Sequence, residues 1–585
     1  MKPVAMLYRV LEFVIPAVLI AVAICIHVPG MQQQVLALPP LWGNVALIGH
    51  VAILAAGALI LQSLLQRHTI LRSAEQLTMR LLSMTLILLV AASVVVFWKY
   101  VVWLIPDTRT TQGIFLMATQ QGSIFDLYSI HQLDHPPMAS PIYPPAFYGL
   151  LRAALAVFGQ SAGVLRWVII AALVVICAAL AAASRRGTRD QWALLAPALF
   201  IAFFPGVTWS GAPTKPEYVA CAFAMVGLAV YLRKGFETHS MRWVPLSASM
   251  FAAALLAKYT LAGAFVAVPV HLLLRRHYRA CIAFLVTSLG VVAIVYIVFE
   301  VLTDGGIVLF TIRANAAKPD LLRFIELGLL GMLPKAFVVV TIGAALALAL
   351  RAEGAGTRET VVPIALLASL LLALLAMARP GSSPNYFLEP VTLGALAIAL
   401  LVRQSIEGTT RETPALFPAA VLLAVAMIQL PSSLALVARK EGSPSEEAEV
   451  RSRLAALRPA EGEFVMADDN YVFDVVKAGY TPVMIDNLLY TSMVDNGVID
   501  DHQWLTLFES GKVPYLVLKN TLEWHASIGY GGRYYPIDIL KYIKQHYTCE
   551  TVMKRWDDNA LVICRKEAKG THQNATPGSY GGRVP

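Results

Sequence analysis

The chain has 585 residues, of which 57% are hydrophobic and 14% are charged, and its mean hydropathy is +0.64. A soluble protein of this length is far less apolar, so the composition indicates an integral membrane protein. The formal net charge of +9 is no argument for a nucleic-acid partner, because much of the Lys and Arg lies in short loops between apolar segments, where membrane orientation accounts for it.

Apolar segments of the length that crosses a bilayer recur along the chain. A spanning helix needs about 20 mostly apolar residues, and about thirteen segments meet that measure. They run near 10–29, 44–66, 80–104, 162–184, 191–209, 216–233, 243–258, 261–276, 280–302, 333–351, 360–379, 386–403 and 414–434. The first is expected to stay uncleaved, because it is long, lacks a clear small-residue cleavage site and precedes further spans.

The connections between these segments alternate in charge. Basic residues fall in every second one, near 67–80, 185–189, 233–234, 275–279, 351–358 and 403–411, whereas 30–43 has no charged residue. The positive-inside rule then places the N-terminus in the cytoplasm, and an odd number of spans places the C-terminal region outside.

The longest outer loop, 105–160, is polar at its start and holds Asp107, Asp126 and Asp134. Its segment 147–158 is too short to cross the membrane and carries an arginine, so we expect it to lie along the interface. A second outer loop, near 303–332, brings Arg313, Lys318 and Arg323 to the membrane surface, and a short third loop runs from 378 to 390.

After about residue 438 the composition becomes that of a soluble domain. Short apolar runs at 464–467, 482–485, 515–518 and 561–564 alternate with helical patterns near 470–478, 503–510 and 536–547. This alternation predicts a small α/β domain. The expected organisation is two extra N-terminal transmembrane helices over 1–77, a transmembrane core over 78–438, an extracytoplasmic α/β domain over 439–567, and a disordered Gly- and Ser-rich tail over 568–585.

Two of the six cysteines, Cys549 and Cys564, lie in polar sequence. A hairpin turning at 557–559 would set Cys564 opposite Val552, so a disulfide to Cys549 requires a bulge or a shifted register. The bridged and the reduced form therefore both stay open.

Four short motifs occur in a fixed order on the outer side. Gly122 and Tyr128 precede Tyr143-Pro144-Pro145 in the long loop, Lys215-Pro216-Glu217 opens a span, Lys258-Tyr259-Thr260 forms a turn, and Asn385-Tyr386-Phe387-Leu388-Glu389 opens a later span. This order resembles the GT-C membrane glycosyltransferases, which include the protein O-mannosyltransferases and the lipid A aminoarabinose transferases. The similarity covers about 78–440, and each motif alone is a weak signal.

The resemblance implies a GT-C-like polytopic α-helical membrane protein that uses a polyprenyl-phosphate-linked sugar as donor. An acceptor hydroxyl must lose its proton as it attacks, and a loop carboxylate can act as the general base, typically contributing about 10²–10⁴-fold. Many relatives have an Asp-Glu pair where this chain has Thr111-Gln112, so the role passes to Asp107, with Asp126 and Asp134 as alternatives. The competing interpretation of Asp107 is a solvated side chain near a helix end.

The departing polyprenyl phosphate needs cations near the outer interface. Lys258, Arg379, Arg313 and Lys318 are suitably placed by topology, although basic residues at span ends also reach the headgroups without any catalytic role. Tyr143 and Asn385 are assigned to substrate binding through their motifs, and the two prolines after Tyr143 are expected to shape the loop. No metal-ligand set is apparent, and a divalent metal stays open because some enzymes of the superfamily use one.

The sequence therefore predicts an inverting glycosyltransferase of the bacterial cytoplasmic membrane that acts on its outer face. The partners would be the polyprenyl-phosphate-sugar, membrane lipids, and an acceptor that is a lipid-linked glycan, a lipopolysaccharide, a wall polymer or a protein. One alternative is a transporter or flippase of a lipid-linked saccharide, for which internal repeats would be expected and none is obvious. Another is an inactive paralogue that binds lipid-phosphate saccharide, favoured by Thr111-Gln112.

Overall fold

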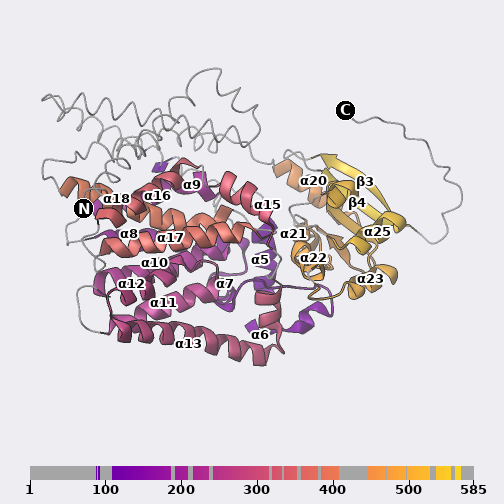
Figure 1. Cartoon of the computed structure of the whole chain (residues 1–585). Helices are drawn as coiled ribbons and strands as arrows, with labels where there is room; N and C mark the ends of the chain where they lie inside the picture. Colours follow the sequence, from indigo (N-terminus) through magenta and orange to yellow (C-terminus); the bar gives the residue numbers. More distant parts are fainter. Residues whose placement is uncertain are drawn as a thin grey trace, which may run out of the picture. The chain divides into compact units, whose positions relative to one another are not determined.

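The computed structural model describes 109–120, 122–185, 191–208, 215–235, 241–314, 319–332, 335–351, 358–379, 384–407, 444–468, 471–495, 497–527, 535–554 and 560–567, together with 87, 90 and 91. The predicted spans 10–29, 44–66 and 414–434, most of 80–104, and the candidates Asp107 and Lys318 lie outside these residues. The chain divides into two compact units (Figure 1). Unit 1 is Met1–Ser129 and Pro141–Lys440, and unit 2 is Ile130–Ser140 and Glu441–Pro585.

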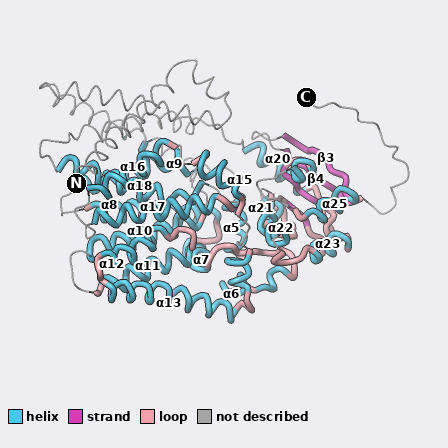
Figure 2. The backbone as a smooth tube through the Cα atoms, in the orientation of Figure 1, coloured by secondary structure: helices cyan, strands magenta, loops and turns pink. Residues whose placement is uncertain are grey.

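The described part of unit 1 is built of helices joined by loops (Figure 2). Each apolar segment predicted between 162 and 403 is helical. The helices are α5 Arg109–Thr119, α6 Ile124–Tyr128, α7 Pro145–Phe158, α8 Ala162–Ser184, η2 Gln191–Leu194, α9 Leu195–Thr208, α10 Pro216–Val230, η3 Tyr231–Gly235, α11 Trp243–Ala257, α12 Gly263–Leu274, α13 Tyr278–Leu302, α14 Gly306–Val308, η4 Leu309–Arg313, α15 Leu321–Arg323, η5 Phe324–Leu330, α16 Ala336–Arg351, α17 Arg358–Met377, η6 Pro384–Phe387 and α18 Leu388–Glu407.

Among the described residues, 5 helices are long and apolar enough to cross a membrane. They are Gly163–Ser184, Pro216–Lys234, Tyr278–Leu302, Thr360–Met377 and Pro384–Gln404. The last is 89% buried inside the protein and Tyr278–Leu302 only 17%, so the former is central to the bundle and the latter presents most of its apolar surface outward.

Close backbone contacts fix the central helices against one another. A Cβ on Gly394 of α18 would lie 2.1 Å from Thr341 Cγ2 of α16, and a Cβ on Gly263 of α12 would lie 2.3 Å from Ser369 Cβ of α17. Small residues at such crossings let membrane helices approach closely, where dispersion contacts hold them together. The N-terminal ends of α12 and α18 are therefore set firmly in place.

The long loop before α8 contains more structure than the sequence predicted. Its start forms α5, and Ser123 begins α6 with a capping box in which Asp126 accepts the Ser123 N–H and donates its own N–H to Ser123 Oγ. The segment 147–158 belongs to α7, whose Arg152 donates to the carbonyls of Ala118 and Gln120 at the C-terminal end of α5. The last carbonyls of α5 are thus satisfied by a cation.

Unit 2 contains a four-stranded sheet with the order β1-β2-β4-β3 (Figure 2). β1 Val465–Ala467 is parallel to β2 Tyr515–Lys519, and β4 Ala560–Lys566 is antiparallel to both β2 and β3 Tyr547–Lys554. The unit also has the helices η1 Ile130–Leu133, α20 Pro444–Ala455, α21 Val472–Lys477, α22 Asn487–Asp495, α23 His502–Glu509, α24 Leu522–Ser527 and α25 Ile537–His546.

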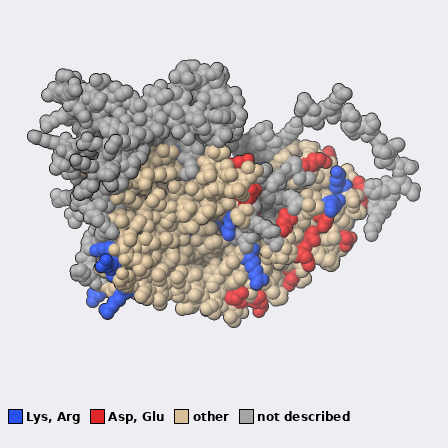
Figure 3. Space-filling model, in the orientation of Figure 1, with Lys and Arg blue, Asp and Glu red and all other residues tan. Residues whose placement is uncertain are grey.

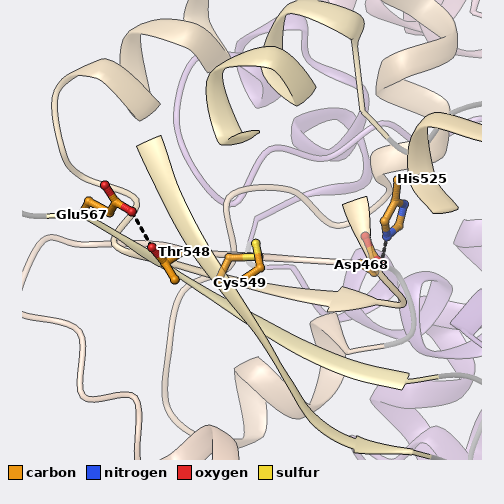
Figure 4. Close-up of a disulfide and its surroundings, with 6 residues drawn as sticks. Asp468, His525, Thr548, Cys549 and Glu567 are labelled. Atoms are coloured by element: carbon orange, nitrogen blue, oxygen red, sulfur yellow. Dashed lines mark hydrogen bonds and ion pairs between the residues drawn. A yellow bond between two sulfur atoms is a disulfide. The ribbon is translucent and has the colours of Figure 1, made fainter. Parts of the chain in front are cut away.

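Cys549 and Cys564 form a disulfide between β3 and β4 (Figure 4). The register changes between Thr551 and Met553, so Val552 is the extra residue of a β-bulge, and Cys549 lies directly opposite Cys564. The sequence left the bridged and the reduced form open, and the structure has the bridged form. The bulge that such a bridge requires is also present.

Candidate active site

Four helix ends meet at one end of the unit 1 bundle. Lys215 precedes Pro216, the first residue of α10, and Glu217 follows in the first turn. Lys258 ends α11, Asn385 lies in η6 just before α18, and Tyr143 precedes the first turn of α7. Prolines at 144, 145 and 216 fix φ where these helices begin, and an N–H there would have no helical partner.

Glu217 is the centre of a buried polar cluster. Its Oε1 accepts a hydrogen bond from Asn385 Nδ2 at 2.5 Å and lies 3.4 Å from Lys258 Nζ. Lys215 Nζ donates to Asn385 Oδ1 at 3.3 Å. Glu217 is 2% and Lys258 8% exposed, so this is a desolvated ion pair, which is costly unless each charge is compensated. We call Lys215, Glu217, Lys258 and Asn385 the ion-pair cluster.

Two tyrosine rings lie against the ammonium group of the cluster. Lys258 Nζ is 4.6 Å from the centroid of Tyr143 and 5.3 Å from that of Tyr386, distances at which a cation is attracted to a ring face. Tyr143 is held in turn, because its carbonyl accepts the Tyr128 hydroxyl and its ring stacks on Tyr148 at 6.2 Å. The Tyr-Pro-Pro element thus forms a wall beside Lys258.

The cluster has unused hydrogen-bonding capacity. Within the described residues, Glu217 Oε2 is buried and has no hydrogen-bond partner. A buried acceptor without a partner is costly, and at a functional site it commonly awaits a ligand group. Within the cluster, two ammonium groups accompany one carboxylate. The arrangement therefore suits a ligand that carries a single negative charge together with a hydrogen-bond donor.

Glu389 has a structural role next to this cluster. Its two carboxylate oxygens accept hydrogen bonds from the backbone N–H groups of Gly263 at 3.1 Å and Ala264 at 2.9 Å, the first residues of α12. A carboxylate at a helix N-terminus satisfies donors that the helix leaves free and interacts favourably with its dipole. Glu389 therefore joins α18 to the start of α12, which follows the Lys258–Thr260 turn in the chain.

The structure brings together three of the predicted binding residues, Lys258, Asn385 and Tyr143. Arg313 is the exposed last residue of η4. Arg379 follows the end of α17, where the Ala378 carbonyl accepts the Asp320 N–H at 2.7 Å, so the turn that holds Arg379 is joined to the second outer loop. Another basic residue, Lys335, is half-buried just before α16.

The two alternative carboxylates have local partners. The Ser123 backbone and side chain hold the pKa of Asp126 below its usual range, which weakens it as a proton acceptor at neutral pH. Asp134 Oδ2 lies 2.8 Å from His131 Nδ1 in the part of the loop that belongs to unit 2. Both carboxylates are exposed, and each stabilises the local turn in which it lies.

The sequence motifs contain Glu217, Lys215 and Tyr386, but the sequence alone did not indicate a function for any of the three. A charged residue on each side of a proline at the start of an apolar span was the available signal, because membrane-embedded charges are expensive and mark functional positions. Their partner Asn385 is 168 positions from Glu217 along the chain, a pairing that only the fold reveals. Within the described ranges, no three His, Cys, Asp or Glu residues lie close enough together to hold a metal ion.

By fold and site, the chain is a helical membrane bundle with a buried lysine–glutamate pair at one end and two tyrosine rings against the lysine. Residues 134–303 match the family model described as dolichyl-phosphate-mannose-protein mannosyltransferase. No curated protein sequence matches the chain.

Solved structures share the fold, among them one of ArnT and one of an oligosaccharyltransferase. The crystal structure of ArnT from Cupriavidus metallidurans bound to undecaprenyl phosphate is 14% identical, with a TM-score of 0.51 over 82% of this chain and 97% of that one. The oligosaccharyltransferase of Archaeoglobus fulgidus in complex with zinc and sulfate is 12% identical, with a TM-score of 0.50 over 80% of this chain and 71% of that one. The predicted resemblance to GT-C membrane glycosyltransferases is confirmed, and the chain has the fold of that superfamily.

Proposed function

We propose that this protein is a glycosyltransferase that moves a sugar from a polyprenyl-phosphate carrier to an acceptor on the outer face of the bacterial cytoplasmic membrane. The observation that carries the proposal is the ion-pair cluster, which three separate stretches of a GT-C-like chain assemble at one end of the bundle. ArnT, the relative of similar fold, was crystallised with undecaprenyl phosphate, a lipid of the same donor class.

The charge of the cluster matches this donor. A sugar joined to a polyprenyl phosphate is a phosphodiester with one negative charge, and the cluster holds two ammonium groups and one carboxylate. Lys258 and Lys215 would bind the phosphate as point charges, and Glu217 Oε2 would accept a hydrogen bond from a sugar hydroxyl. As the donor bond breaks, charge accumulates on the phosphate, so cations fixed beforehand stabilise the transition state more than the ground state.

The proposed reaction is a single displacement. The acceptor hydroxyl oxygen forms a bond to the anomeric carbon while the bond from that carbon to the phosphate oxygen breaks, and the polyprenyl phosphate leaves with the electron pair. Attack from the side opposite the phosphate inverts the anomeric centre. Asp107 would take the hydroxyl proton, and Asp126 is the weaker alternative because its pKa is held low by Ser123.

Charge and redox chemistry support the outer location. The site lies where α10, α12 and α18 begin. Basic residues lie near the opposite ends of the same three helices. Figure 3 shows Lys and Arg side chains gathered where α12 meets α13, the connection that holds Arg275, Arg276 and Arg279. By the positive-inside rule that end is cytoplasmic, and the Cys549–Cys564 disulfide fits an oxidising compartment for unit 2.

The test is mass spectrometry of lipid-linked and envelope glycans from a deletion strain complemented with wild type, Lys258→Gln, Asp107→Asn or Lys541→Gln. Lys541 is exposed on α25 and pairs with Asp538, so its variant controls for loss of a lysine away from the cluster. We expect one sugar to be lost on deletion and to be restored by wild type and Lys541→Gln, and not by the other two. Accumulation of a complete lipid-linked precursor, with both site variants complementing, would instead establish a transporter.

A further inference from the structure

Part of the long outer loop is built into the sheet of unit 2. Met138 donates its backbone N–H to the Val483 carbonyl at 3.0 Å, and its carbonyl accepts the Ile485 N–H at 3.0 Å. These residues form a parallel bridge between Met138 and Met484, and Pro482 forms another to Val465 of β1. The loop therefore adds a short extended segment outside residues 482–485, which lie between it and β1, in the way that extended peptides bind to an exposed sheet edge.

This added strand is part of a core. Met138, Ala139 and Ser140 are fully buried, as are Val483 and Met484 opposite them. Two backbone hydrogen bonds together with buried apolar side chains make the pairing specific in register, because a shift by one residue would turn Met138 away from the interior. We call residues 130–140 the strap.

Both ends of the strap continue directly into the wall of the ion-pair cluster. Before it, Tyr128 is buried in unit 1, and five residues after Met138 comes Tyr143, whose carbonyl accepts the Tyr128 hydroxyl. Tyr143 is the residue whose ring lies against Lys258 Nζ at 4.6 Å. A strand held by unit 2 is thus joined by a few residues to a side chain of the candidate active site.

From this connection we propose that unit 2 positions the Tyr143 wall through the strap, so that pairing of Met138 with residues 483–485 and the order of the Tyr143-Pro-Pro element are energetically coupled. Met138 and Ile485 are positioning residues in this scheme. The coupling is reciprocal by linkage: whatever binds between Tyr143 and Lys258 also stabilises the strand pairing in unit 2. The proposal rests on the proposed function only in naming the ligand, because the coupling itself needs no turnover.

Hydrogen–deuterium exchange on the full-length protein tests the coupling without any activity assay. Ile485→Pro removes the N–H that Met138 accepts, and Ile485→Val keeps it, so the second variant is the matched control. We expect Ile485→Pro, and not Ile485→Val, to speed exchange at the Met138 amide and in the first turn of α7 by about two- to tenfold, the range for loss of one hydrogen bond. Faster exchange confined to the strap and 482–486, with α7 unchanged, overturns the proposal.

A second variant guards against simple misfolding of unit 2. Met138→Pro removes the other hydrogen bond from the loop side, with Met138→Leu as its control, and should produce the same change in α7 while exchange in β2 and β4 stays at the wild-type level. Added undecaprenyl phosphate should then slow exchange at Ile485 in wild type and not in Met138→Pro. If that lipid protects the Lys258–Thr260 turn but leaves Ile485 unchanged in wild type, the coupling is wrong while the donor assignment stands. If the lipid protects neither segment and the α7 response persists, the donor assignment fails and the coupling stands.

Discussion

At the scale of single residues, the ion-pair cluster shows what a sequence motif can and cannot supply. Lys258 and Asn385 were predicted to bind substrate because of the motifs that hold them, but the motifs did not indicate that both contact Glu217. The missing information is tertiary, since the contact joins the first turn of α10 to the turn before α18. Asp107 remains a prediction, as it lies outside the described residues.

The buried pair makes a specific prediction about stability. Lys258→Met should lower the free energy of unfolding by about 3–5 kcal/mol, because it leaves the Glu217 charge buried without its partner. Adding Glu217→Gln removes that charge and should recover most of the loss. Thermal unfolding in detergent measures both, and the double variant should regain stability without regaining sugar transfer. If Lys258→Met alone is as stable as wild type, another group must compensate the buried charge of Glu217.

At the scale of elements, hydrophobic length and periodicity predicted the long apolar helices between α8 and α18 well, because a bilayer leaves few alternatives to a helix. The predicted second outer loop, near 303–332, instead contains the short helices α14, η4, α15 and η5. α5 was missed since its start is polar and lies in a presumed loop, although Ile114 and Leu116–Ala118 are buried. In unit 2 the runs at 464–467, 515–518 and 561–564 coincide with β1, β2 and β4. The hairpin turning at 557–559 implies a strand where β3 lies, but no apolar run marks it, because residues such as Thr548 and Glu550 are polar. Its register depends on the bulge at Val552.

Helix crossings supply the test at this scale. Gly394→Ala places a Cβ 2.1 Å from Thr341 Cγ2, so α18 must move away from α16, at a cost of about 1–3 kcal/mol for overpacking. Gly290→Ala in α13 meets nothing within 4 Å and is the matched control. We expect the first variant to lower the midpoint of thermal unfolding and to reduce sugar transfer, since α18 begins beside Asn385. Equal midpoints for the two variants would mean that the α16–α18 crossing relaxes without cost.

At the scale of the whole molecule, orientation follows from where charges and cysteines lie. The helices that begin at the ion-pair cluster have Arg233, Arg275 and Arg403 near their other ends. Such an asymmetry between the two ends of several helices is a stronger signal than the charge of any single loop. It predicts that the cluster faces outward, where the proposed polyprenyl-linked donor would be used, and that unit 2 lies in the same compartment.

Labelling of introduced cysteines decides the orientation. Glu509→Cys puts an exposed thiol on α23 of unit 2, and Arg279→Cys puts one in the first turn of α13 at the basic end. A membrane-impermeant maleimide should modify the first in intact spheroplasts and the second only after lysis. Cys549 and Cys564 should be protected unless a reductant is added, because they are bridged, and replacing both with serine should cost about 3 kcal/mol for a 15-residue loop. Labelling of Arg279→Cys from outside would invert the topology and would move the ion-pair cluster to the cytoplasmic face, where the proposed outer transfer could not take place.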